Sequence, residues 1–233
     1  MLHGIPILGQ WPGTVRTTVP RGGGWSSGVV ERTHRRLAPE DIVELDHGVR
    51  ATSVERTLVD LGATRSALSA IVAISHARRG GTSLESIEAA LVRAGRMVGV
   101  GKARIAVQGS VAGSDSPLET LVVVRCRDLG FAAPEQQRAV RGVDGGMYWV
   151  DFAWRDGAIL GEADGKLKYR AVEGRPTPAE VLWSEKRRED AIRQRCGAFL
   201  RVGWDDAWHG AGLELRLLEA GVPRVRLPRP LTR

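Results

Sequence analysis

The fold of the second half of this 233-residue chain depends on two runs, Tyr148-Trp-Val-Asp-Phe-Ala-Trp154 and Gly161-Glu-Ala-Asp-Gly-Lys166. The first run is rich in aromatic and β-branched residues, and the apolar stretch from Ala158 to Ala163 leads into the second. Such runs between Gly- and Asp-rich turns are typical of strands. With a third run from Gln136 to Val140, they predict a meander of three strands.

Helices are expected on both sides of these strands. Ser116-Pro-Leu-Glu119 combines an N-cap residue, a proline at the first helical position and a glutamate three residues after the cap, which predicts a helix start. Downstream we predict a long charged helix over Pro178–Cys196, a short buried strand over Phe199–Val202 and a final helix over Leu213–Ala220. The order α-β-β-β-α-β-α predicts an α/β (α+β) fold.

Three acidic residues lie in the two central strands. Asp151 lies in the first strand, and Glu162 and Asp164 end the next, where a spacing of two places them on one face. If the strands pair as a hairpin, Asp151 faces the other two. Carboxylate oxygens are the ligands that a hard cation such as Mg²⁺ requires. Without a cation, a cluster of these acids would be costly, because like charges repel. With Lys166 beside them, the pattern suggests metal-dependent phosphodiester hydrolysis.

The same acids have a second interpretation. Acids beside glycines at strand ends are common in solvated turns, and Asp-Gly is an ordinary hairpin signal. The spacing of Asp151, Glu162 and Asp164 is compatible with both interpretations.

Residues 116 to about 208 resemble a known group of domains. The resemblance is carried by Val150-Asp-Phe-Ala-Trp154, Gly161-Glu-Ala-Asp-Gly165, Glu185-Lys-Arg-Arg-Glu-Asp190 and Leu200-Arg-Val202. These motifs are similar to those of the restriction-endonuclease-like domain of unknown function related to very-short-patch-repair endonucleases, within the PD-(D/E)xK superfamily. The resemblance implies a small mixed sheet flanked by helices in the order α-β-β-β-α-β, and a DNA endonuclease that uses Mg²⁺ or Mn²⁺.

The resemblance assigns the acids in two registers. In the register that we favour, because related sequences read E-x-D-G, Asp151 and Glu162 bind the metal and Asp164 takes the place of the superfamily's lysine. In the other, Asp164-Gly165-Lys166 is itself a D-x-K motif, so Asp164 is the ligand and Lys166 the catalytic lysine. Both registers keep Asp151.

Three further residues match accessory positions of these domains. Glu119 matches an acid of the leading helix that can approach the metal, although its capping-box spacing explains it equally well. Arg188 and Asp190 match a charged segment that faces the active site, but a charge run on a helix is usually a solvated face.

The chain departs from these relatives in one respect. Relatives commonly carry a histidine a few residues after the D-G, a candidate general base, where this chain has Lys166, Lys168 and Tyr169. A mechanism based on that histidine is therefore excluded. Lys166 could substitute, and a catalytically silent nucleic-acid-binding protein becomes a second hypothesis.

The first half begins with a different pattern. Thr14–Val19 and Val29–His34 predict two strands joined by a glycine turn at Arg21-Gly-Gly-Gly24, and Val49–Thr52 predicts a third strand.

Helical spacing follows these strands. A serine at position 53 can cap a first helix, and further helices are predicted over Ser66–Arg79 and Ser83–Arg93, where Thr82 and Glu85 have capping-box spacing. Residues 1–108 therefore form a module of strands and helices, and the flexible segment 109–115 is predicted as a linker. The nuclease-like domain covers 116–222, and the basic Pro- and Arg-rich tail 223–233 is expected to be extended.

The first half also resembles a known group. Thr17-Thr-Val-Pro-Arg21, Arg32-Thr-His-Arg-Arg36, Asp41-Ile-Val43 and the run from Thr52 to Leu61 are similar to the middle region of AbiEi-type antitoxin and transcriptional-regulator proteins. The resemblance implies a protein partner of toxin–antitoxin type.

A basic cluster in the first half, Arg32, Arg35 and Arg36, is the candidate DNA-phosphate contact there. The cluster is equally compatible with a solvated strand end.

Composition sets broad limits on these hypotheses. The formal charge of +7 is compatible with a nucleic-acid partner but also with a merely basic surface. No apolar stretch approaches the roughly 18 residues of a membrane helix, and we expect no membrane partner. Two cysteines, Cys126 and Cys196, and no recognisable secretory signal indicate the cytoplasm.

The sequence thus predicts a Mg²⁺- or Mn²⁺-dependent endonuclease acting on DNA and fused to an antitoxin-like module. The alternative is a non-catalytic DNA-binding regulator or antitoxin-like protein that keeps the nuclease fold as a scaffold. A third hypothesis is a protein-binding member of a toxin–antitoxin pair that makes no contact with nucleic acid.

Overall fold

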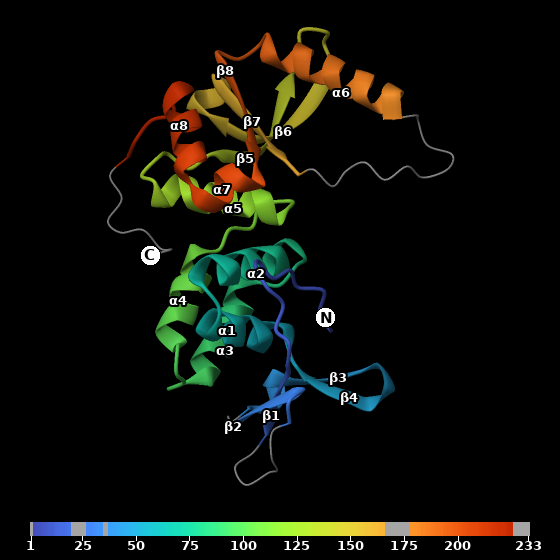
Figure 1. Ribbon diagram of the computed structural model, residues 1–233, viewed down its shortest axis with the longest axis vertical. Helices are drawn as coiled ribbons and strands as arrows, with labels where there is room; N and C mark the ends of the chain where they lie inside the picture. Colours follow the sequence, from blue (N-terminus) through green and yellow to red (C-terminus); the bar gives the residue numbers. More distant parts are fainter. Residues whose placement is uncertain (1, 20–26, 35–36, 166–177, 226–233) are drawn as a thin grey trace. The chain divides into compact units, whose positions relative to one another are not determined.

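A computed structural model describes residues 2–19, 27–34, 37–165 and 178–225 (Figure 1). The chain divides into two compact units between Ala112 and Gly113, inside the segment 109–115 that the sequence predicts as a linker. None of the helices in this described part combines the length and the apolar character that a membrane span requires.

The first unit consists of short paired strands and packed helices (Figure 1). In chain order these are β1 (Val15–Val19), β2 (Val30–His34), β3 (Ile42–Leu45), β4 (Val49–Thr52), α1 (Val54–Thr64), α2 (Ala67–Arg79), α3 (Leu84–Ala94) and α4 (Val100–Gly109). The predicted strands and helices are all present, whereas β3 and α4 were not predicted.

The pairing of the first two strands differs from the sequence expectation. Strands β1 and β2 pair in parallel, with Val15 opposite Val30 and Val19 opposite His34. Parallel neighbours cannot be joined by a tight hairpin turn, because the chain must return to the same end of the sheet. The two predicted strands are therefore not the arms of a hairpin, and the glycine turn expected at 21–24 lies outside the described residues. Strands β3 and β4, by contrast, form an antiparallel pair.

Serine caps start helices α1, α2 and α3 of this unit. The Ser53 hydroxyl accepts a hydrogen bond from the Arg56 amide at 3.2 Å, and Ser83 accepts one from the Ser86 amide at 3.1 Å. The cap of α3 is therefore Ser83 and not Thr82, one residue later than predicted. Each cap satisfies an amide that has no partner within its helix.

Two glycines allow helices α1 and α4 to approach closely. A Cβ atom on Gly62 would lie 2.8 Å from the Cα of Ala103, and one on Gly99 would lie 2.4 Å from the carbonyl oxygen of Ala63. Gly99 also has a φ of 84°, which favours glycine. The start of α4 is thus set by a glycine cap that the apolar periodicity does not reveal.

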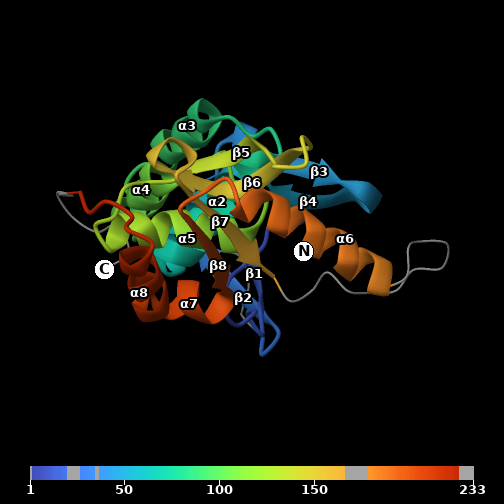
Figure 2. The same ribbon diagram turned by 90° about the horizontal axis from the view of Figure 1, so that it is seen from above.

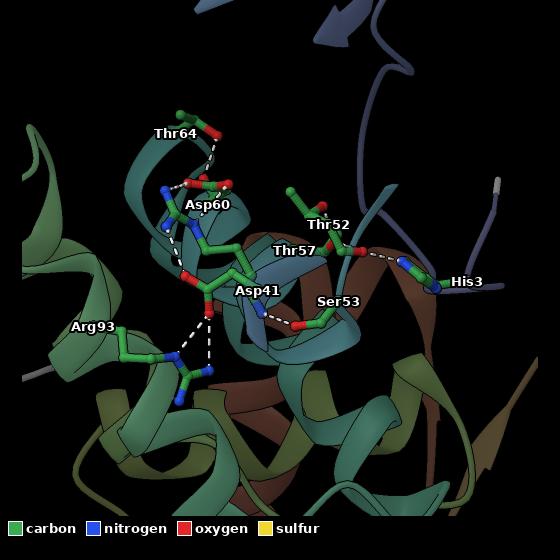
Figure 3. Close-up of polar contacts among 9 residues, drawn as sticks. His3, Asp41, Thr52, Ser53, Thr57, Asp60, Thr64 and Arg93 are labelled. Carbon is green, nitrogen blue, oxygen red and sulfur yellow. Dashed lines mark hydrogen bonds and ion pairs between the residues drawn. The ribbon is translucent and has the colours of Figure 1, made fainter. Parts of the chain in front are cut away.

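A buried ion-pair network ties the turn before β3 to helices α1 and α3 of this unit (Figure 3). Asp41 is fully buried. One of its carboxylate oxygens accepts from Arg93, with Nε at 2.9 Å, and the other accepts from Arg56 Nη1 at 3.2 Å. Arg56 also reaches Asp60, one turn along α1, at 3.2 Å. Because buried charges are costly unless paired, each partner is needed to keep the others stable.

The second unit is a four-stranded mixed sheet between helices (Figures 1 and 2). Its elements are α5 (Pro117–Asp128), β5 (Glu135–Arg141), β6 (Met147–Trp154), β7 (Ile159–Asp164), α6 (Pro178–Arg193), β8 (Ala198–Gly203), α7 (Trp204–His209) and α8 (Ala211–Glu219). Helix α6 lies on one side of the sheet, and α5 and α7 lie on the other. The sequence did not predict helix α7.

The strand order is β5-β6-β7-β8. The first three strands form the predicted antiparallel meander, and β8 pairs in parallel with β7 after the crossover through α6. Val150, Leu160 and Ile192 form a core between the sheet and α6. The observed order of elements is α-β-β-β-α-β-α-α, which agrees with the predicted mixed α/β class.

The start of the C-terminal tail is packed rather than extended into solvent. The Pro223 carbonyl accepts from the Ala132 amide at 2.8 Å. Arg224 donates to the Leu129 carbonyl at 3.0 Å and lies over the Phe131 ring, 4.5 Å from its centroid. Residues Pro223 and Arg224 are therefore bonded to the rest of the unit, and the remainder of the predicted tail, 226–233, lies outside the described residues.

Candidate active site

Asp151 lies where strands β6 and β7 separate. Their pairing runs from Trp154 opposite Ile159 to Phe152 opposite Gly161, and Asp151 and Glu162 are the next residues on the two strands. There the Asp151 carboxylate accepts from the Ala163 amide at 2.8 Å. Beyond the last backbone pair, the Ala163 amide therefore bonds to the Asp151 side chain and not to a backbone carbonyl of β6. This bond holds one oxygen of the Asp151 carboxylate in place.

Glu162 is largely buried between two arginines. Its Oε1 accepts a short hydrogen bond from Arg188 of α6, and its Oε2 lies 4.0 Å from Arg201. Arg201 is directly opposite Glu162 in the parallel pairing of β7 with β8. Arg188 also donates to the Trp149 carbonyl at 3.0 Å, so it bridges β6 and β7.

The other predicted residues of this region have different surroundings. Asp164 is half-exposed and lies 3.8 Å from Arg201, on the same side as Glu162. Lys166 lies outside the described residues. Asp190 is exposed on α6, and the acid of α6 that contacts Arg201 is its neighbour Glu189.

Glu119 is buried behind Asp151 and has a capping role. It accepts from the Ser116 hydroxyl at 2.7 Å and from the Asp115 amide at 2.7 Å, while its own amide donates to the Ser116 hydroxyl at 3.2 Å. These contacts form a capping box that starts α5. A third donor, the Gln137 amide at 2.9 Å, leaves Glu119 well satisfied.

The acids influence one another through Asp151. Burial raises the pKa of Glu162 above its usual range, Arg188 lowers it, and the negative charge of Asp151 raises it again. Burial also raises the pKa of Glu119, and its hydrogen bonds oppose the shift while Asp151 adds to it. Asp151 is therefore close enough to both glutamates to repel them, and a cation between these acids would relieve that repulsion.

Sequence reasoning assigned no role to Gln137 and Arg201. Gln137 contacts two of the predicted acids, and Arg201 contacts Glu162 and Asp164. The signal for Gln137 is the pair of consecutive glutamines near the start of β5. The signal for Arg201 is a charged residue within the short apolar run from Phe199 to Val202.

The structure describes only part of the basic cluster of the first half. Arg32 is half-buried on β2, opposite Thr17. Arg35 and Arg36 lie outside the described residues.

Comparisons of the chain with protein-family models, with curated proteins and with solved structures found no match. Among the described residues, no group of three or more His, Cys, Asp or Glu side chains is arranged to hold a metal ion. The candidate site thus consists of two acids, Asp151 and Glu162, with Glu119 behind them and Arg188 and Arg201 beside them.

Proposed function

We propose that the second unit is a Mg²⁺-dependent phosphodiesterase that acts on DNA. The observation that carries the proposal is the position of Asp151 and Glu162, which follow the last paired residues of two adjacent strands. Repulsion between their carboxylates and burial of Glu162 make this arrangement unfavourable unless a positive charge compensates it. The resemblance of residues 116 to about 208 to PD-(D/E)xK nucleases supports the same assignment.

The donor set fits Mg²⁺ or Mn²⁺. Mg²⁺ in phosphoryl-transfer sites is usually held by one or two carboxylates, with waters and substrate phosphates completing the octahedron. Asp151 and Glu162 would be these two carboxylates. Asp151 Oδ1 has only a long contact of 3.4 Å with Gln137, so it keeps acceptor capacity. When bound, the cation would polarise the attacking water and neutralise charge on the phosphate oxygens.

The arginines have a separate role in the proposal. Arg188 and Arg201 place two permanent positive charges beside the acids. A guanidinium group can donate two parallel hydrogen bonds to the oxygens of one phosphate, and it remains positively charged at every relevant pH. We assign these side chains to the DNA backbone, and the cation would replace them as the partner of Glu162.

The position of Glu162 supports the register in which it is the second ligand. Glu162 is the residue next to the last β6–β7 pair, and the charge of Asp151 acts on it directly. Asp164 is farther along β7, half-exposed, and is held by Arg201. In this register Asp164 takes the place of the lysine, and Arg201 is the cation closest to it on the described strands.

Purified protein is expected to cut DNA in the presence of Mg²⁺ or Mn²⁺ and to lose this activity in EDTA. The measurement is conversion of supercoiled plasmid to nicked or linear DNA, together with cleavage of labelled single- and double-stranded oligonucleotides. Ca²⁺ is the matched control for binding without cleavage. The proposal fails if no DNA substrate is cut with either cation.

One observation favours a second candidate function, a non-catalytic DNA-binding regulator. The ion pair of Arg188 with Glu162 neutralises the second acid without a metal. This candidate predicts that the protein binds DNA without cutting it and that the binding weakens as the salt concentration rises. It also predicts that an Asp151→Asn variant binds DNA as tightly as the wild type. Absence of DNA binding even at low salt would instead favour a protein partner of toxin–antitoxin type.

The Glu162→Gln variant is expected to be at least as stable as the wild type at pH 7.5. Because the pKa of Glu162 is raised in the folded state, the unfolded state loses its proton first as pH rises above about 4.5. Wild-type stability associated with this group is therefore present at low pH and lost as pH rises through the raised pKa. Glutamine cannot ionise and avoids this loss.

Urea denaturation of metal-free protein at pH 4 and pH 7.5 measures the difference. The two proteins should converge at pH 4, where the wild-type carboxyl is protonated. A Glu162→Gln variant that is less stable than the wild type at pH 7.5 would mean that the Arg188 ion pair outweighs burial.

A further inference from the structure

Gln137 adopts a backbone conformation that a strand does not require. Its φ is 50°, in the left-handed region that residues other than glycine rarely occupy. It lies inside β5, between Gln136, which pairs with Phe152, and Arg138, which pairs with Val150. Strained backbone of this kind persists where the surrounding structure holds it, often at a functional site.

The side chain of Gln137 joins two acids that come from different elements. Its Nε2 donates to Glu119 Oε2 of α5 at 2.9 Å and to Asp151 Oδ1 of β6 at 3.4 Å. A primary amide carries two hydrogens, so one nitrogen can serve both carboxylates. The amide therefore separates two negative groups that would otherwise face each other without a donor between them.

Donors from two directions thus contact the two oxygens of Asp151. The Ala163 amide of β7 donates to Oδ2 at 2.8 Å, and the Gln137 amide of β5 makes a longer contact of 3.4 Å with Oδ1. Rotation of the carboxylate about its bond to Cβ would lose both contacts, while Oδ1 keeps capacity for a further partner. One donor is a backbone amide, which only a proline at position 163 would remove, so Gln137 is the donor whose side chain can be varied without changing the backbone.

We propose that Gln137 is a positioning residue that orients the Asp151 carboxylate for cation binding and keeps Glu119 from competing for the cation. This role rests on the proposed metal-dependent function. Groups that hold a ligand in place typically change metal affinity by about 10- to 100-fold when they are replaced. The strained φ at Gln137 is then the conformation that brings its amide between the two acids.

The test compares Gln137→Gly and Gln137→Leu with Gln136→Leu in the full-length chain. Glycine accepts the φ of 50° without strain and lacks the amide, while leucine keeps the bulk of the side chain. Gln136 is the matched control, because its amide donates to the Ser114 hydroxyl and to no acid of the site. The probe is Mn²⁺ alone, without DNA. Its binding is measured by calorimetric titration and by the electron paramagnetic resonance signal of the ion.

Both Gln137 variants are expected to bind Mn²⁺ about tenfold or more weakly than the wild type, whereas Gln136→Leu stays within about twofold. Gln137→Gly should unfold at the same temperature as the wild type or higher, because strain is relieved. A purely structural role predicts the reverse, lower thermal stability with unchanged affinity.

Two failures can be told apart. If the wild type binds Mn²⁺ and Gln137→Gly binds it within twofold, the positioning role is wrong and the proposed function stands. If the wild type binds no Mn²⁺, the proposed function is wrong and the positioning role falls with it. Should Gln137→Leu fail to fold, Gln137→Gly still decides between these outcomes.

Discussion

The Asp151→Asn variant is expected to lose metal-dependent DNA cleavage by about 10³-fold or more, equivalent to about 4 kcal/mol of transition-state stabilisation. Both registers of the nuclease motif place a metal ligand at Asp151, and its charge acts on both neighbouring glutamates. Asparagine keeps the shape of the side chain, and its carbonyl oxygen can still accept from the Ala163 amide. The loss should therefore appear in the rate and not in the fold.

The measurement is the single-turnover rate of plasmid or oligonucleotide cleavage at saturating Mg²⁺, with thermal unfolding recorded on the same samples. The matched control is Glu135→Gln, which changes an acid to its amide on the neighbouring strand. Glu135 is exposed and pairs with Arg138 at 2.7 Å, outside the acid cluster, so its rate should stay within about twofold because exposed ion pairs contribute little. An Asp151→Asn protein that cuts at the wild-type rate would assign the cleavage to another site.

The elements that the sequence predicted correctly are those with a local signal. Ser116 and Glu119 form the capping box that their spacing predicts, and the strands of the meander are runs joined by Gly- and Asp-rich turns. Helix α4 escaped prediction because it starts at a glycine cap and contains further glycines, which obscure the apolar periodicity. The parallel pairing of β1 with β2 depends on partners that are distant along the chain.

The residues of the candidate site also divide into those with a local sequence signal and those placed by distant parts of the chain. The adjacent positions of Asp151 and Glu162 on neighbouring strands could be predicted, because consecutive strands of a meander pair with each other. The position of Arg201 beside Glu162 could not, because it depends on the parallel register of β8 after a crossover. The contacts of Gln137 depend on its φ of 50°, and the pair of glutamines at 136 and 137 marks the position without encoding that angle.

The Asp41→Ala variant is expected to destabilise the first unit by about 3–5 kcal/mol, the usual cost of removing one partner from a buried ion pair. Asp41 is fully buried and compensates two arginines, one of them, Arg56, almost fully buried as well. Without Asp41, Arg56 would keep its contact with Asp60, which is one-quarter exposed. Since a domain is stable by only about 5–15 kcal/mol, this loss is a large part of the total.

Chemical denaturation of the full-length chain, followed by circular dichroism, should show an earlier unfolding transition for this variant. The control is Glu31→Gln, which breaks the exposed Arg16–Glu31 pair of 2.9 Å and should change stability by less than about 1 kcal/mol. A double variant, Asp41→Ala with Arg56→Met, should recover part of the lost stability, because it removes the buried charge left behind. Additive losses in the double variant would instead mean that the two side chains stabilise the unit through packing and not through their charges.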